Sequence, residues 1–195
     1  SDDRSGIALT DSTVYIVGDG ATARYDLDML TPPAVLPVMD GLVTDLRLGK
    51  IYSLYSAVDG MMTTNPGLFT VDGIIALDAN LASAGDTVLF SQSFDVNYGM
   101  DQTGIFSGYG EFIINSGEDG IVYVIDFDNG AVEALGSHPM NHSYSENWAY
   151  WGVAGFDGVD RYVYYRDNFS DNILAHNLAT DATNYISNLP YMSDM

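Results

Sequence analysis

Apolar and polar residues alternate with a period of two along much of the chain, in short runs bounded by Gly, Asp and Asn. Such runs are typical of strands that bury one face, and no useful window has the period of an amphipathic helix. Asp-Gly pairs favour tight turns between antiparallel strands. They occur at Asp59-Gly60, Asp72-Gly73, Asp119-Gly120 and Asp157-Gly158. The pattern predicts an all-β protein made of antiparallel sheet.

One feature of this pattern repeats at nearly equal intervals. An alternating apolar strand ends in Asp or Asn and enters a turn at Asp26, Asp78, Asp126 and Asn177, which gives spacings of 52, 48 and 51 residues. Two strands are predicted before each of these anchors and one after it, so each repeat holds four strands. The predicted strands are 7–9, 13–17, 23–28 and 34–38; 43–48, 51–55, 75–80 and 87–90; 104–107, 111–114, 124–130 and 131–135; and 151–156, 161–165, 175–180 and 184–187.

Four-stranded repeats of 40 to 50 residues are typical of β-propeller blades. A β-sandwich also has many short strands and frequent turns, but it predicts no fifty-residue period. We therefore expect an all-β fold, a β-propeller of four four-stranded antiparallel blades, as one domain over residues 1–195. The expected blades are approximately 6–40, 41–92, 102–138 and 145–190. They make either a complete small propeller or part of a larger ring.

The excess of acidic over basic residues limits the kinds of molecule that the protein can bind. Acidic residues number 27 and basic residues 6, for a net charge of −21, while 14 Tyr, 8 Phe and 2 Trp supply enough apolar area for a core. Nucleic acid and anionic membrane surfaces are excluded, because both attract clustered basic groups and the basic residues here are scattered singly. No apolar run approaches the ~18 residues of a membrane helix, so no membrane insertion is expected. The absence of cysteine excludes disulfides and thiolate metal sites.

The last quarter of the chain resembles a known kind of blade. The matching segments are Ser145 to Ala154, which reads SENWAYWGVA, Ile186 to Leu189, and the closing Ser193-Asp194-Met195. They are similar to blades of secreted and surface-anchored bacterial proteins, among them large myxobacterial and sorting-signal-bearing surface proteins of mostly unassigned function. The resemblance implies an extracellular or cell-surface location and a chain that continues past the terminal Ser-Asp-Met. It brings no catalytic residues with it.

Asp126-Phe127-Asp128-Asn129-Gly130 has the alternating oxygens with which calcium loops begin. Glu133 comes too early to serve as the bidentate ligand of such a loop. The alternative is a tight hairpin, in which Asp and Asn side chains accept hydrogen bonds from their own backbone and Gly adopts a positive φ. The hairpin is the prediction. Calcium elsewhere on so acidic a surface stays open, and no other cofactor is expected.

The candidate binding residues follow from strand parity. Antiparallel neighbours reverse direction, so the turns between third and fourth strands lie on one face, and the second-to-third loops and blade connections lie on the other. All the long loops are of the second kind: 57–67, 94–103, 137–147 and 167–171. Binding residues favour loops held by a rigid frame. The predicted ligand-binding residues are Tyr98, His138, His142, Glu146 and Trp148.

Two of these groups have competing interpretations. His138, His142 and Glu146 carry donor atoms suited to a transition metal, but Pro139 places them in a loop, where their spacing has no helical meaning. The metal is therefore left unknown. Trp148 offers either blade-to-blade packing or a stacking platform for a sugar ring.

The expected function is a non-catalytic extracellular propeller module for binding or for a structural, adhesive role, with a glycan or protein ligand. The alternative is a fragment of a carbohydrate-active propeller enzyme, of glycoside hydrolase or lyase type. Such an enzyme would gather two or three carboxylates near the axis. A homodimer, or assembly with missing blades, is expected if the four blades do not close.

Overall fold

The computed structural model describes residues 6–17, 21–37, 39, 41–61, 67–98, 104–116, 121–137, 156–157, 161–166, 173–180 and 182–187. These residues form strands and no helix, as the alternating pattern predicts. No helix in the described part of the chain is long and apolar enough to cross a membrane.

The strands form four separate antiparallel sheets, which we number in chain order. Sheet 1 contains β1 (Gly6–Leu9), β2 (Thr13–Val17), β3 (Thr22–Asp26) and β4 (Ala34–Leu36). Sheet 2 contains β5 (Leu42–Asp45), β6 (Lys50–Ser56), β7 (Gly60–Met61), β8 (Gly67–Leu77) and β9 (Ser83–Tyr98). Sheet 3 contains β10 (Gly104–Phe106), β11 (Glu111–Ser116), β12 (Ile121–Asp126) and β13 (Val132–Ser137). Sheet 4 contains β14 (Phe156–Asp157), β15 (Tyr162–Arg166), β16 (Ile173–Asn177) and β17 (Ala182–Ser187).

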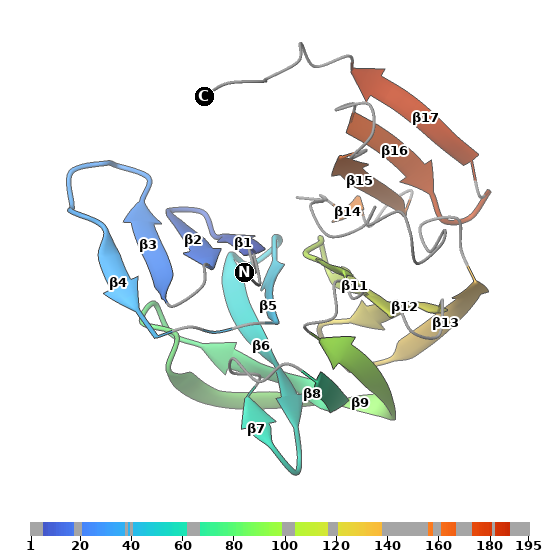
Figure 1. The fold of residues 1–195 in the computed structure, drawn as a ribbon, viewed down its shortest axis with the longest axis horizontal. Coiled ribbons are helices and arrows are strands. Elements are labelled where there is room, and N and C mark those ends of the chain that lie inside the picture. Colours follow the sequence, from blue (N-terminus) through green and yellow to red (C-terminus); the bar gives the residue numbers. More distant parts are fainter. Residues whose placement is uncertain are drawn as a thin grey trace.

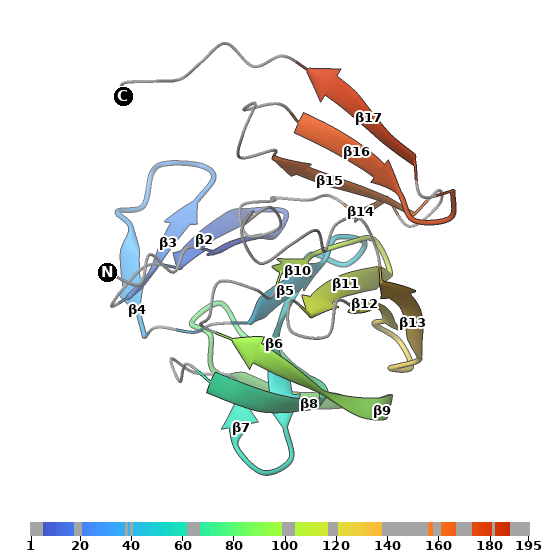
Figure 2. The ribbon, with the colours of Figure 1, turned by 45° about the vertical axis from the view of Figure 1, so that its right-hand side comes forward.

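The sheets are arranged around a common middle in the manner of propeller blades. Each is a simple up-and-down meander, with β7 added beside β6 in sheet 2. The first strand of each sheet lies nearest the middle and the last lies at the outside (Figures 1 and 2). Among the described residues, no strand of sheet 1 pairs with a strand of sheet 4, so hydrogen bonding does not close the circle there.

Two parts of sheet 2 differ from the prediction. A loop was expected from Phe94, but β9 continues to Tyr98 and pairs with an equally extended β8, so that expectation is wrong for residues 94–98. Burial of Phe94 against Tyr123 of sheet 3 is the physical reason. A turn was expected at Asp72-Gly73, yet both residues lie within β8. They sit at a bulge, where Val71 pairs with Phe94 and Gly73 with Leu89.

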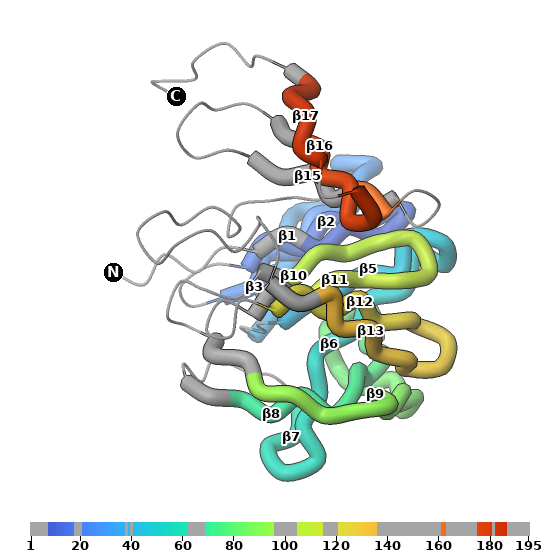
Figure 3. Tube along the Cα trace, turned by 90° about the vertical axis from the view of Figure 1, so that its right-hand side faces the viewer, coloured from blue at the N-terminus to red at the C-terminus, as the bar shows by residue number. Residues whose placement is uncertain are grey.

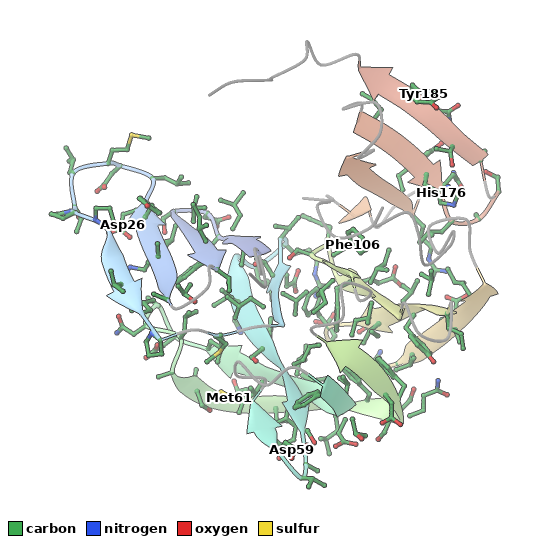
Figure 4. All side chains as sticks on the ribbon, viewed as in Figure 1. Asp26, Asp59, Met61, Phe106, His176 and Tyr185 are labelled. Carbon is green, nitrogen blue, oxygen red and sulfur yellow. The ribbon has the colours of Figure 1, made fainter. Side chains whose placement is uncertain are left out.

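The core consists of apolar layers between successive sheets. Between sheets 1 and 2, Ala8 and Tyr15 pack with Ile51 and Leu77. The layer between sheets 2 and 3 is larger and rich in aromatic rings: its members include Tyr52, Leu54, Val71, Ile74, Phe94, Phe112, Ile114, Tyr123, Ile125 and Phe127. Phe106 of β10 is buried near the middle (Figure 4). Successive residues of a strand therefore point into two different apolar layers, one on either side of the sheet.

Candidate functional site

The short turns collect on one face of the molecule, which we call the turn face (right side of Figure 3). In three sheets, the backbone N–H that follows the anchor donates to the carbonyl just before the second strand. The bonds run from Leu27 to Ser12 at 2.8 Å in sheet 1, from Phe127 to Gly110 at 3.0 Å in sheet 3, and from Leu178 to Arg161 at 3.0 Å in sheet 4. The parity prediction for the third-to-fourth turns is confirmed in these three sheets.

The anchors themselves are turn-forming residues. Asp126 Oδ1 accepts the backbone N–H groups of Asp128 at 2.7 Å and Asn129 at 3.0 Å, and Gly130 has a φ of +69°. Asp78 and Asn177 accept backbone N–H groups in the same way. The hairpin interpretation of Asp126 to Gly130 is confirmed. Asp126 Oδ1 therefore caps the turn between β12 and β13.

Arginine side chains on the turn face tie neighbouring sheets together. Arg47, in the turn after β5, donates to the buried Asp45 carboxylate at 2.8 Å and to Asp128 of sheet 3 at 2.8 and 3.0 Å. These hydrogen bonds raise the pKa of Arg47, and the guanidinium holds the pKa of Asp128 below its usual range. The group is a structural ion network between sheets 2 and 3.

Two further arginines make corresponding ties. Arg24 of sheet 1 donates to Ala79 O at 3.0 Å and to Asn80 Oδ1 at 3.1 Å, both in the β8–β9 turn. Arg161 of sheet 4 donates to Glu133 at 2.7 Å and to Glu111 at 3.3 Å in sheet 3. Burial opposes the charge of Arg161, but its glutamate contacts outweigh that effect and raise its pKa. Much of the turn-face charge is therefore engaged in holding sheets together.

Arg161 also has a strained backbone, which yields a prediction. Its φ is +51°, and the residues at the corresponding place before β6 and β11 are Gly49 and Gly110, both with positive φ. Arg161→Ala loses the ion pairs and keeps the strain, whereas Arg161→Gly loses the ion pairs and relieves it. In urea unfolding we expect the glycine variant to be the more stable by about 1 kcal/mol. Equal stability would show that residue 161 does not hold this conformation in solution.

Three aspartates of sheet 1 are the exception on the turn face. Asp11, Asp26 and Asp28, with Ser12 and Leu27, line an open hollow of about 480 Å³. Asp26 has Arg24 at 3.7 Å, and Asp28 Oδ1 accepts only the Leu30 backbone N–H among the bonds seen here. No group of three His, Asp or Glu side chains in the described ranges is placed to hold a metal ion.

The opposite face, which we call the loop face, carries a projecting two-stranded ribbon. Residues 67–71 of β8 and 94–98 of β9 pair with each other, beyond the point where β8 last pairs with β6 at Gly73. In Figure 3 the coloured parts of β8 and β9 extend from the short turns toward the opposite side. Phe69, Val71 and Phe94 face the core. The directly paired Thr70 and Asp95 lie on the opposite side of the ribbon and present polar groups there.

Those polar groups form hydroxyl–carboxylate pairs. Thr70 Oγ1 donates to Asp95 Oδ1 at 2.7 Å, and Ser93 Oγ donates to Asp72 Oδ1 at 2.5 Å. Asp72 Oδ2 accepts the Ala57 backbone N–H at 2.7 Å, and the bonds from Ser93 and Ala57 hold the pKa of Asp72 below its usual range. Both pairs are exposed. We call Thr70, Asp72, Ser93 and Asp95 the ribbon site.

Of the predicted binding residues, only Tyr98 falls in the described part of the chain. It is the last residue of β9, opposite Gly67 at the end of the ribbon, so its position lies on the loop face near the ribbon site. His138, His142, Glu146 and Trp148 lie outside the described residues. The ribbon site was not among the predicted residues. The alternation of Phe94, Val96 and Tyr98 with Asp95 and Asn97 is the signal that could have found it.

The fold and site define an all-β protein of antiparallel, propeller-like sheets. No protein-family model matches the sequence, and no curated protein matches it. Among solved structures, a complex of dihydro-heme d1 dehydrogenase NirN with DHE is 14% identical, with a TM-score of 0.44 over 96% of this chain and 37% of that one. Streptogramin B lyase is 9% identical, with a TM-score of 0.45 over 92% and 66%. Apo AztD from Citrobacter koseri is 12% identical, with a TM-score of 0.38 over 93% and 47%. The chain thus spans less than two thirds of each of these structures' chains.

Proposed function

We propose that this chain is a non-catalytic β-propeller module of a secreted or surface-anchored bacterial protein, in which it binds a glycan through the loop face. Its antiparallel sheets serve as the blades. The acidic surface and the resemblance of residues 145–195 to blades of bacterial surface proteins support the location. A strongly negative chain stays soluble by self-repulsion outside the cell.

The observation that carries the proposal is the unequal use of polar groups on the two faces. On the turn face, Arg47, Arg161 and their carboxylate partners are engaged in ties between sheets. On the loop face, the ribbon site presents exposed carboxylates that hydroxyl and backbone donors hold in place. Carboxylates that are held in place but form no contact between sheets are available to bind a ligand.

A glycan suits this chemistry. An ionised carboxylate accepts hydrogen bonds from sugar hydroxyls, and its fixed orientation lowers the entropy lost on binding. Each carboxylate oxygen has two acceptor sites, so Asp72 and Asp95 retain capacity after their intramolecular bonds. Trp148 would supply a ring surface on which a sugar stacks, and Tyr98 at the end of the ribbon would supply a further contact. The proposed site combines the ribbon site with the residues predicted from sequence.

The test is binding of the full chain to an array of immobilised oligosaccharides. For the saccharide bound most strongly, we expect Asp95→Asn to weaken binding about tenfold, because a charge-assisted hydrogen bond contributes roughly 1.5–3 kcal/mol. Asp86→Asn is the matched control, since Asp86 is an exposed aspartate of the same strand outside the ribbon. No saccharide bound, or equal loss in both variants, would contradict the proposal. Cleavage of a bound saccharide would favour the enzyme alternative.

A second set of variants tests the predicted loop residues. Single alanine replacements of Tyr98, His138, His142, Glu146 and Trp148 should weaken binding to the same saccharide. Because exposed loop residues contribute little to the core, the melting temperature should fall by no more than about 2 °C. Unfolding of these variants would show that the residues pack between sheets instead of binding a ligand.

A further inference from the structure

Within the described ranges, no other sheet covers one apolar face of sheet 1. Tyr15 and Arg24 lie on the face toward sheet 2. The alternate residues lie on the other face and include Leu9, Ile16, Tyr25 and Val35, all classed as exposed large apolar side chains. Ile16 and Tyr25 each expose 41% of their surface. A contiguous exposed apolar face of this kind is typical of an interaction surface. We call it the free face.

The positions of sheet 3 that correspond to Ile16 and Tyr25 are buried. The pair Thr13–Asp26 of sheet 1 corresponds in register to Glu111–Asp126 of sheet 3. Ile16 therefore corresponds to Ile114, and Tyr25 to Ile125. Both residues of sheet 3 are 0% exposed, because sheet 2 packs on them. The free face thus has the composition and register of a sheet-to-sheet interface, and none of the described sheets packs on it.

The turn edge of the free face shows which charge the partner should carry. Asn80 and Asp128 each stand two residues after an anchor, and each accepts an arginine from the preceding sheet, namely Arg24 and Arg47. Asp28 occupies the same position in sheet 1, beside Asp26 and Asp11 around the open hollow. The place is acidic and exposed, so it is complementary to an arginine.

We propose that the free face of sheet 1 docks a further antiparallel β-sheet, outside residues 1–195, that presents an apolar face and an arginine at its turn edge. The arginine would reach Asp28 as Arg47 reaches Asp128. The free face would thus form a third interface of the kind seen between sheets 1 and 2 and between sheets 2 and 3. This docking does not depend on the proposed glycan binding. The partner is defined by its chemistry, and the interfaces of sheet 1 with sheet 2 and of sheet 2 with sheet 3 define how it would pack.

The fourth sheet of a second copy fits this surface poorly. At the positions that correspond to Tyr15 and Arg24, sheet 4 has Tyr164 and Ala175. Arg161 of sheet 4 is already bound to Glu111 and Glu133. Two copies would also bring net charges of −21 together. The partner that we propose is therefore a separate sheet that carries its own arginine.

The first experiment compares matched positions in the full chain. Ile114→Ser should lower the melting temperature by roughly 5–15 °C, as a polar replacement in a core does. Ile16→Ser should lower it by no more than about 2 °C and should reduce binding of an apolar fluorescent dye. Equal loss from both variants would overturn the proposal, because the free face would then be covered by the chain itself. A concentration-dependent dimer that Ile16→Ser abolishes would also overturn it, in favour of a second copy.

The second experiment supplies a sheet of the required chemistry. Residues 6–41 are repeated ahead of residue 6, so that the native connection between sheets 1 and 2 joins the added sheet to the native sheet 1. The added sheet presents Tyr15 and Arg24 to the free face. We expect the melting temperature to rise by at least about 3 °C and dye binding to fall. Arg24→Ala in the added sheet alone should remove part of the gain. An added sheet that stays sensitive to protease, with an unchanged melting temperature, would overturn the proposal.

Discussion

Replacing Gly130 with alanine is expected to lower the free energy of unfolding by about 3 kcal/mol or more, because the new methyl group has no room and the backbone conformation disfavours it. The φ of Gly130 is +69°. A Cβ there would lie inside contact distance of the Leu89 carbonyl oxygen, in the neighbouring sheet. The strand β9 would have to move away from the turn between β12 and β13.

That movement would undo a set of contacts between sheets 2 and 3. The Ser91 N–H donates to Gly130 O at 2.8 Å, and Ser91 Oγ accepts the Val132 N–H at 3.0 Å. On either side of Ser91, the ring of Phe90 lies 6.1 Å from that of Phe112, and the ring of Phe94 lies 4.2 Å from that of Tyr123. The bulged part of β9, between Leu89 and Phe94, thus holds sheets 2 and 3 together.

Gly85→Ala is the matched control, measured with Gly130→Ala by urea unfolding. Gly85 lies on the same strand with a φ of +99°, but nothing stands within 4 Å of the place where its Cβ would be. It should show backbone strain alone, about 1 kcal/mol. If the two variants lose the same stability, β9 does not seat against the β12–β13 turn as described here.

The strands could be predicted because their information is local. Alternation, anchor residues and turn residues recur within each repeat, and every strand of the structure except β7 overlaps a strand predicted from them. The short β7, the early start of β8 at Gly67 and the extension of β9 are the departures. The extension has the same alternation, in Phe94, Val96 and Tyr98, but the Asp-Gly turn signal upstream and the polar run Ser91-Gln92-Ser93 suggested a loop.

The bulge and the arginine ties could not be predicted, since each depends on residues far apart in the chain. Phe94 is buried because Tyr123 of another sheet stacks on it, and Arg47 finds Asp128 eighty-one residues away. In the sequence, single arginines scattered among acidic residues served only as an argument against a nucleic-acid partner. Their structural role emerged only from the way in which successive sheets face each other.

Replacing Arg47 with methionine is the second change from which we expect a large loss in the free energy of unfolding, about 3–5 kcal/mol. The reason is that it leaves a buried carboxylate without its counter-charge. Asp45 is 0% exposed. It keeps the backbone N–H groups of Arg47 at 3.0 Å and Gly110 at 3.3 Å, but loses its only counter-charge among the contacts seen here. Methionine retains the length and apolar stem of the arginine, so the loss reports the charge.

A second variant and a control separate the buried charge from the exposed ion pair. The double variant Asp45→Asn with Arg47→Met should recover part of the stability, since the buried group is then neutral. Arg24→Met should lose no more than about 1 kcal/mol, because its partners Ala79 and Asn80 are exposed and uncharged, and its contact with the partly exposed Asp26 is as long as 3.7 Å. A loss from Arg47→Met as small as that from Arg24→Met would contradict the role of the buried pair.

The pH dependence of the same variant tests the other half of the network. Arg47 holds the pKa of Asp128 below its usual range, so the stability from this pair is present at neutral pH and is lost as the pH falls through that lowered pKa. The Arg47→Met variant lacks the pair. Between pH 7 and about pH 3, the melting temperature of the native chain should therefore fall more steeply than that of the variant. Parallel curves would mean that Asp128 does not pair with Arg47 in solution, which would leave the buried Asp45 as the only carboxylate that this arginine serves.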